Sequence, residues 1–542
     1  MNLPRHVARL EMLLLVLFSS GSANAVEPAI VFCDQMVLQR GVSAPVWGRG
    51  EPGERVTVTF AGQTKQAKTG ADSLWHVKLD AMSASAQPRT MTIKGKDNAV
   101  ALKNVLVGDV WLFSGDIVPL GYYQGRFLKR SRMGVYYDIR PFIKEDLSGR
   151  LPIIRTYEAP PRSRERHAIR PQYRFDTDGK AKWTAYDPES WSGFHAIAYF
   201  FGRRYFKRVK APVGFLQIGL DDLASMTPPE GFESTAALKD LAKVVGTWYP
   251  ASPEGRTAHL KMLGDVKKWL VSTRRSLDAG STNPDDFSQV PRMPGPPPRT
   301  VAETTYYNAA ICPIAPFAVR GMILKTLDKN QYDKRYADKA EALIRGLRAV
   351  MNSPEAPAAF FQFRPPMYWE QRAVEDQSVW MRFRLMQQGV SKAPATTVLP
   401  AHDFVNDPRD PGNWARRASQ WAIAAVEKQP VLSGPVYDSH KTAGRTVTVR
   451  FKQVGRGLIV GDKKMGRLVK PAADTPLGGF ELAGADGRWR RATAKIDGKS
   501  VIVTSGDLAR PVSVRYAWAP RPKQANLYNQ SGFPALPFNT HP

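Results

Sequence analysis

The chain has 542 residues and a formal net charge of +28, because 77 Lys and Arg outnumber 49 Asp and Glu. A chain of this length forms about two to four domains, and its positive charge favours polyanionic partners. The absence of zinc-ligand spacing and RNA-binding motifs argues against nucleic acid and leaves acidic polysaccharide, an anionic envelope polymer or a negative membrane face as expected partners.

Residues 1–25 have the pattern of a secretory signal peptide. Arg5 and Arg9 precede a short apolar run, and residues 23–25 form an Ala-Asn-Ala cleavage site. We therefore expect an exported protein, periplasmic or extracellular after cleavage. No later stretch is long enough to predict a transmembrane helix.

Residues 26–107 are predicted to form an N-terminal β-domain. Apolar and polar residues alternate along three segments, and Gly- and Asp-rich turns separate them. The segments are residues 56–60, 75–79 and 91–95.

Residues 108–430 combine the apolar pattern of strands with that of helices, and this combination predicts an α/β domain. Buried strands are expected at 213–218 and 319–324, and amphipathic helices at 332–350 and 414–425. Strands that alternate with helices favour a doubly wound sheet covered on both faces. Two stretches with little pattern, at about 121–175 and 280–300, are predicted insertions.

Residues 431–542 return to a strand pattern and predict a C-terminal β-domain, with strands at 447–451, 501–504 and 512–518. The fold class is therefore α/β plus all-β. Cys33 and Cys312 are the two cysteines of the sequence. A chain this large needs no disulfide to hold its core, so we favour two buried thiols over one disulfide.

Residues 108–119, GDVWLFSGDIVP, have the pattern of a buried strand that delivers a functional turn after Ser114 and Gly115. The stretch resembles the first active-site block of the sialate O-acetylesterase family of SGNH hydrolases, approximately GEVWLCSGQSNM. Further segments resemble the β-regions of that family, at 32–40, 434–440, 478–484, 526–529 and 534–538. The resemblance implies an SGNH-hydrolase-like doubly wound α/β/α domain flanked by N- and C-terminal β-sandwich-like domains.

The resemblance also implies that the family's nucleophile is missing. Ile117 falls on the serine that attacks the acetyl ester, and its hydrocarbon side chain has no proton to lose. Ser114 is a poor substitute, because three strand residues span ~10 Å and an odd step points to the opposite face. Asp116 is a weak candidate nucleophile, and a carboxylate bonded to the turn backbone is the alternative.

The other catalytic blocks of the family are altered as well. Asp221 and Asp222 occupy its glycine pair and are candidates for general bases or a cation site, against a helix cap or solvated loop. Asn330 alone is retained in the third block. In the last block Asp410 survives and Gly412 falls on the catalytic histidine, which leaves His402 as a weak substitute base. We expect no metal site and no cofactor.

These observations predict a catalytically impaired or inactive relative of the exported sialate O-acetylesterases that binds acidic or acylated glycan. A cluster of aromatic and cationic residues after the altered turn is the candidate binding site, against an ordinary basic insertion. Its members are Tyr122, Tyr123, Arg126, Lys129, Arg130, Arg132, Tyr136 and Tyr137.

Two rival hypotheses remain open. The first is an active carbohydrate O-acetylesterase rewired through Asp116, Asp221 or Asp222 with His402. The second is a structural component of an envelope assembly that uses its two β-regions as interaction surfaces. The alternative to a polyanionic partner is a positive surplus that is spread over the surface and merely suits the habitat of the protein.

Overall fold

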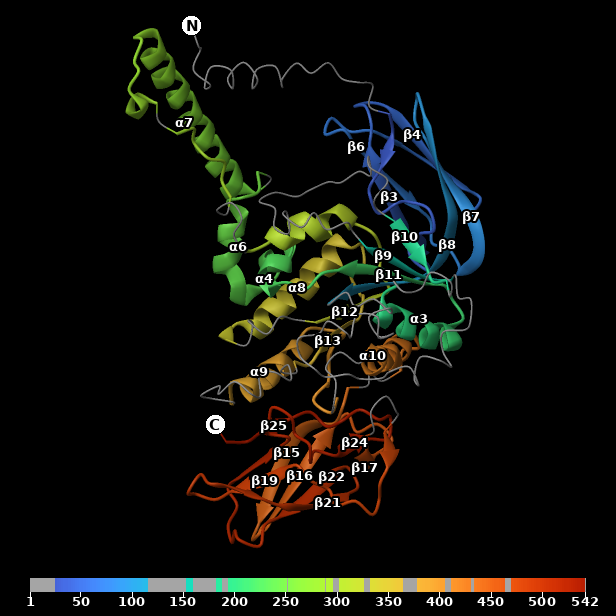
Figure 1. The fold of residues 1–542 in the computed structure, drawn as a ribbon, viewed down its shortest axis with the longest axis vertical. Coiled ribbons are helices and arrows are strands. Elements are labelled where there is room, and N and C mark those ends of the chain that lie inside the picture. Colours follow the sequence, from blue (N-terminus) through green and yellow to red (C-terminus); the bar gives the residue numbers. More distant parts are fainter. Residues whose placement is uncertain are drawn as a thin grey trace, which may run out of the picture.

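The computed structural model describes residues 25–115, 153–158, 182–187, 194–250, 252–287, 289–295, 302–325, 332–363, 378–404, 411–429, 433–463 and 469–541. The chain is a mixed α/β protein with several sheets, and antiparallel β-regions lie on both sides of a central parallel sheet (Figure 1). No described helix is both long and apolar enough to span a lipid bilayer.

The N-terminal β-region is built of eight strands. They are β1 (Glu27–Pro28), β2 (Val37–Gln39), β3 (Ala44–Arg49), β4 (Arg55–Phe60), β5 (Gln63–Lys68), β6 (Leu74–Leu79), β7 (Ser85–Lys94) and β8 (Ala99–Ser114). Strands β1, β3 and β6 form one antiparallel sheet, whereas β2, β4, β5 and β7 join the central sheet through β8. The predicted boundary after residue 107 therefore falls inside β8, a strand of 16 residues that belongs to both regions.

The central region contains the remaining strands of the large sheet and the helices. The strands are β9 (Ile154–Glu158), β10 (Lys182–Ala185), β11 (Val213–Ile218), β12 (Gly321–Leu324), β13 (Ala358–Phe361) and β14 (Thr396–Leu399). The helices are α3 (Ala196–Val209), α4 (Leu223–Met226), α5 (Pro229–Glu233), α6 (Lys239–Gly246), α7 (Pro253–Asp278), α8 (Tyr336–Val350), α9 (Ser378–Gln388) and α10 (Pro411–Val426). Turns of 3₁₀ or π-helix occur at Ala236–Leu238, Pro284–Asp286, Tyr307–Ile311, Cys312–Ile314 and Gly389–Lys392.

The central sheet has the strand order β10-β9-β11-β8-β12-β13-β14. All neighbours from β9 to β14 are parallel, and β10 alone runs antiparallel along this path. All six residues of β11 are buried, as expected for a strand covered on both faces.

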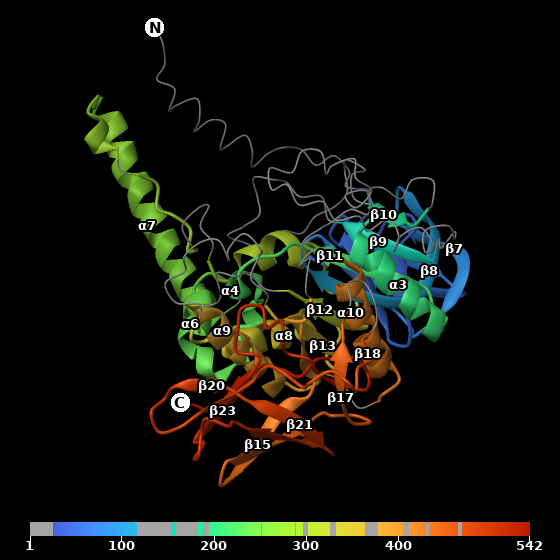
Figure 2. The ribbon, with the colours of Figure 1, turned by 60° about the horizontal axis from the view of Figure 1, so that its bottom comes forward.

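Helices cover both faces of this sheet because side chains along each strand alternate between them. On β8, Trp111 and Phe113 share a hydrophobic core with α3 and α10, whereas Val110 and Leu112 share another core with α8. The Trp111 ring contacts Trp421 of α10 edge to face, with 5.8 Å between ring centroids. Helices α3 and α10 lie side by side in both views (Figures 1 and 2).

The C-terminal β-region consists of three antiparallel sheets around a core of its own. Its strands are β15 (Val436–Ala443), β16 (Thr446–Lys452), β17 (Leu458–Asp462), β18 (Lys470–Pro471), β19 (Phe480–Ala483), β20 (Trp489–Arg491), β21 (Thr493–Asp497), β22 (Ser500–Thr504), β23 (Ser513–Tyr516), β24 (Leu527–Asn529) and β25 (Phe538–Asn539). Cys33 and Cys312 are not joined by a disulfide, and Cys33 is half-buried where we expected a buried thiol.

Candidate functional site

The carboxyl edge of the parallel sheet is the first place to seek a site, because ligands of open α/β sheets bind there where the strand order reverses. The chain passes from β8 to β11 on one side and then returns to β12 on the other, so the reversal lies between β8 and β12. Ser114 pairs in register with Ile218 and with Leu324, which brings the ends of three strands level. Residues that follow these ends can meet at one point.

Ser114 is fully buried at this edge, and its hydroxyl donates to the carbonyl oxygen of Gly219 at 3.2 Å. This contact ties the end of β8 to the turn after β11. Gly115 follows, and a Cβ there would lie 2.9 Å from the Phe113 ring, so a larger residue would displace that ring. The serine hydroxyl therefore stabilises the packing of the end of β8 against the turn after β11.

Asp221 and Asp222 start helix α4. The Asp222 carboxylate accepts from the backbone N–H of Ala224 at 3.0 Å, as an N-cap. The buried Asp221 carboxylate accepts from Ser225 Oγ at 2.9 Å and from the Asp222 N–H at 2.7 Å. Both carboxylates thus satisfy local donors in the turn.

His402 lies buried just beyond β14, and its Nδ1 is 3.2 Å from Oε1 of Gln362 at the end of β13. This contact joins the imidazole to the amide of Gln362. His402 also lines a cavity of about 290 Å³ together with Asp403, Lys463 and Tyr528. Strand β14 is three positions from β8, or ~14 Å at the usual strand spacing, so His402 is not adjacent to Ser114.

Asp403, next to His402, accepts hydrogen bonds from two other elements. Arg417 of α10 donates to its two oxygens at 2.8 and 2.9 Å, and the Tyr528 hydroxyl of β24 donates to it at 3.4 Å. Burial alone would raise the pKa of Asp403, but the charge and hydrogen bonds of Arg417 outweigh it and hold that pKa below its usual value. The carboxylate joins the central region to the C-terminal one.

Two polar residues of the edge have no counterpart among the sequence predictions. His195 caps α3, since its Nδ1 accepts from the Ala198 N–H at 3.1 Å, and its ring lies against Phe113. The neutral ring then carries its proton on Nε2 and is a donor, not a base. Lys325, next after β12, places Nζ 5.7 Å from the Trp414 ring centroid. Lys325 could have been found from the sequence, because it directly follows a predicted strand. His195 could not, because it follows no predicted element.

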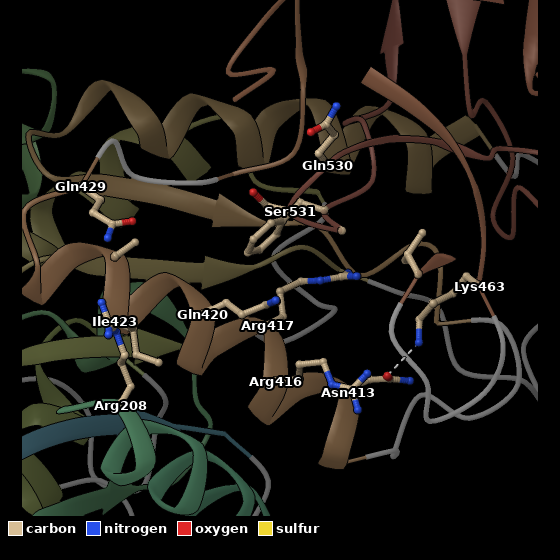
Figure 3. A pocket seen from close by; sticks show the side chains of 14 residues that line it. Arg208, Asn413, Arg416, Arg417, Gln420, Ile423, Gln429, Lys463, Gln530 and Ser531 are labelled. Atoms are coloured by element: carbon tan, nitrogen blue, oxygen red, sulfur yellow. Dashed lines mark hydrogen bonds between the residues drawn. The ribbon is translucent and has the colours of Figure 1, made fainter. Parts of the chain in front are cut away.

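A second cavity, of about 550 Å³, lies between α10 and the C-terminal β-region (Figure 3). We call it the basic cavity, because its lining includes four cations and, among the described residues, no carboxylate. The cations are Arg208, Arg416, Arg417 and Lys463, and the amide side chains are Asn413, Gln420, Gln429 and Gln530.

The cations of the basic cavity are held at different points around it. Arg208 pairs with Glu427 at 2.6 Å and Arg417 with Asp403, while Lys463 donates to Asn413 Oδ1 at 3.0 Å. Figure 3 shows Gln530 and Ser531 on the wall opposite α10. The arrangement suits a polar, anionic ligand that reaches both regions.

Gly412 lies in the first turn of α10. The remaining predicted site residues lie outside the described residues. They are Asp116, Ile117, Tyr122, Tyr123, Arg126, Lys129, Arg130, Arg132, Tyr136, Tyr137, Asn330 and Asp410. Within the described part of the chain, no group of three or more His, Cys, Asp and Glu side chains is arranged to hold a metal ion.

The fold resembles that of a carbohydrate acetylesterase from Xanthomonas citri, with a TM-score of 0.68 and 24% identity over 95% of this chain and 99% of that one. A protein from Arabidopsis thaliana has a TM-score of 0.26 and 10% identity over 59% of this chain and 97% of that one. A family 39 glycoside hydrolase from Bacteroides cellulosilyticus has a TM-score of 0.15 and 12% identity over 90% of this chain and 99% of that one. TM-scores as low as these two do not indicate a shared fold. No protein-family model and no curated protein matches the chain. The similarity to the Xanthomonas enzyme extends over nearly all of both chains and shows a shared fold.

Proposed function

We propose that this chain is an exported, sialate O-acetylesterase-like protein of SGNH type that binds acidic or acylated glycan and whose ester hydrolysis is impaired or lost. The observation that carries the carbohydrate assignment is the likeness to the Xanthomonas carbohydrate acetylesterase along nearly the whole of both chains. The signal peptide proposed at residues 1–25 supports export.

The strand order supports the SGNH part of the proposal. With the outer strands β9 and β10 left out, numbering along the chain gives β11-β8-β12-β13-β14 the order 2-1-3-4-5, which is one of the two common doubly wound orders. In this arrangement the turn after β8 carries the reacting group. Residues 108–430 would then form the catalytic-type domain, with residues 26–107 and 431–542 as flanking β-domains.

The loss of hydrolysis follows from the chemistry of the family positions. Ester cleavage by a triad needs a hydroxyl within hydrogen-bond reach of an imidazole. Ile117 and Gly412 replace that pair in the alignment with the family. The nearby Ser114 hydroxyl donates a hydrogen bond to the Gly219 carbonyl oxygen. Losing one triad member lowers the rate by about 10⁴-fold or more, so losing both leaves little activity.

We assign the anionic part of the glycan to the basic cavity. A sugar carboxylate there would accept charge-assisted hydrogen bonds from Arg416 and Lys463, while its hydroxyls would meet the amides of Gln420 and Gln530. The aromatic and cationic cluster at residues 122–137 remains a second proposed contact, on the same chemistry.

Binding to immobilised acidic polysaccharide tests this assignment. Replacing both Arg416 and Lys463 by Ala is expected to weaken binding at least tenfold, because hydrogen bonds to charged groups are worth about 1.5–3 kcal/mol each. Lys495→Ala, which removes an exposed cation on β21, is the matched control. Retention of neutral polysaccharide only, or equal binding by the double variant and the control, contradicts the assignment.

A rewired esterase is the second candidate, favoured by the buried imidazole of His402 beside a cavity. It predicts hydrolysis of an aryl acetate or an O-acetylated sugar that disappears with His402→Ala or Asp116→Asn. Turnover no faster than buffer at high protein concentration excludes this candidate and supports the leading one.

A further inference from the structure

Helix α7 projects from the rest of the molecule in both views (Figures 1 and 2). Its 26 residues make it ~39 Å long. Ser252 caps it by accepting from the Gly255 N–H at 2.9 Å. Its buried residues, Gly255, His259 and Met262, all lie in the first ten positions, where it packs against α6. The second half of the helix therefore lies away from the body of the protein.

An apolar stripe runs along the outer side of α7. Its members are Leu260, Leu263, Leu270, Val271 and Leu277, with exposed fractions of 59%, 57%, 50%, 56% and 44%. At 100° per residue they fall within an arc of about 120°, so they form one surface. Single exposed leucines are ordinary, but a continuous stripe on a projecting helix marks an interaction site.

Cations accompany this apolar stripe. The helix carries six Lys and Arg against three Asp and Glu. Asp265 pairs with Lys261 and Asp278 with Arg274, each at 3.0 Å. Lys267, Arg274 and its partner Asp278 lie inside the arc of the stripe, and Lys268 and Arg275 lie along one side of it. Leucines mixed with cations are typical of a helix that lies in a lipid headgroup layer.

A second copy of the chain fits this surface poorly. Positions 260, 263, 267, 270, 274 and 277 have heptad spacing, so a paired helix would place Lys267 and Arg274 at successive a positions of the seam. In a parallel pair each would face its own like charge, in a chain whose net charge is already +28. At a lipid surface the same two side chains would cover apolar area with their stems and reach phosphates with their charged ends.

We propose that α7 docks on an anionic phospholipid surface, with the apolar stripe inserted at the boundary between headgroups and acyl chains. The basic residues beside the stripe face the headgroup phosphates. This attachment uses no residue of the carboxyl edge or of the basic cavity, so it is independent of the proposed glycan function.

Co-sedimentation of the full mature chain with vesicles tests the proposal. We expect binding to vesicles that contain phosphatidylglycerol, little binding to pure phosphatidylcholine, and release as salt rises. Replacing Leu263 and Leu270 by Ser is expected to lower the partition coefficient at least tenfold. Val512→Ser, which removes a side chain that is 59% exposed in the C-terminal region, is the matched control.

Three results would overturn the proposal. The first is no binding to anionic vesicles at low salt. The second is equal binding by the double variant and the control, which would assign binding to overall charge. The third is a concentration-dependent dimer in light scattering that Leu263→Ser dissociates, which would assign the stripe to a second copy. Unchanged circular dichroism of the variant confirms that it is folded, since both leucines are exposed.

Discussion

The two β-regions are joined to the parallel sheet in different ways. On the N-terminal side, β8 runs unbroken from one region into the other, and the fully buried Asp109 on it binds Arg40 and the Tyr205 hydroxyl at 2.8 Å each. On the C-terminal side, a separate hydrophobic core meets the sheet through polar contacts of Asp403, Arg384 and their partners. Among the described, buried apolar residues of this region, only Phe533 and Leu536 pack into the central cores. The first junction is part of the core, whereas the second is an interface between two cores.

This difference bears on function, because the basic cavity lies at the second junction. A continuous strand leaves no room for a ligand between regions, whereas an interface between two cores can enclose one. We therefore expect the N-terminal region to unfold together with the sheet, and the C-terminal region to behave as a second unit.

The largest expected effect is that of Asp109→Ala. Removing this carboxylate leaves Arg40 without its bidentate partner and is expected to cost about 3–5 kcal/mol of unfolding free energy. Denaturant unfolding should show the N-terminal region and the sheet losing structure in one transition. Asp474→Ala, at an exposed position, is the control. A separate early transition of the N-terminal region alone would contradict the comparison.

A smaller effect is expected for Arg384→Met at the second junction. This fully buried guanidinium donates to the carbonyl oxygens of Ala519 and Pro520 at 2.9 and 2.7 Å. Its loss leaves these acceptors unsatisfied, at about 1–3 kcal/mol for each. Hydrogen exchange should then accelerate in the C-terminal region while the parallel sheet stays protected. Equal acceleration of exchange in the C-terminal region and in the parallel sheet would show that the two unfold as one unit.

The smallest effect concerns acid. The pKa of Asp403 lies below its usual value because Arg417 outweighs the effect of burial. The pair of Asp403 and Arg417 therefore adds its full share to the free energy of unfolding above the pKa of an Asp in the unfolded chain, about 3.9. This stabilisation is lost as the pH falls through the lower pKa of Asp403 in the folded protein. Unfolding free energy measured across this acid range should fall more steeply for the natural chain than for Asp403→Asn. Identical slopes would show that the pair adds no pH-dependent stability.

Much of this scaffold could be predicted from the sequence. The segments predicted at 56–60, 75–79 and 213–218 correspond to β4, β6 and β11, because strict alternation or a fully apolar run allows few other structures. Helix α10 was visible from Trp414, Ala418 and Trp421, which recur at helical spacing and face the sheet.

Other features were beyond the sequence for physical reasons. Helix α7 packs little of its length, and Lys267 and Arg274 interrupt the run of apolar residues at helical spacing, so the helix was not predicted. The basic cavity gathers Arg208, Arg416 and Lys463 from three separate parts of the chain, and only tertiary structure brings them together. The structure shows Asp222 as a helix cap, but the residues at the altered turn after β8 lie outside its described part.

Labelling with a fluorophosphonate tests the central claim most directly, because this reagent forms a stable adduct with an activated serine. We predict no covalent adduct on the purified mature chain, since the family's nucleophile position holds Ile117 and the Ser114 hydroxyl donates to a backbone carbonyl. An adduct on any serine of the carboxyl edge would contradict it and identify an active esterase.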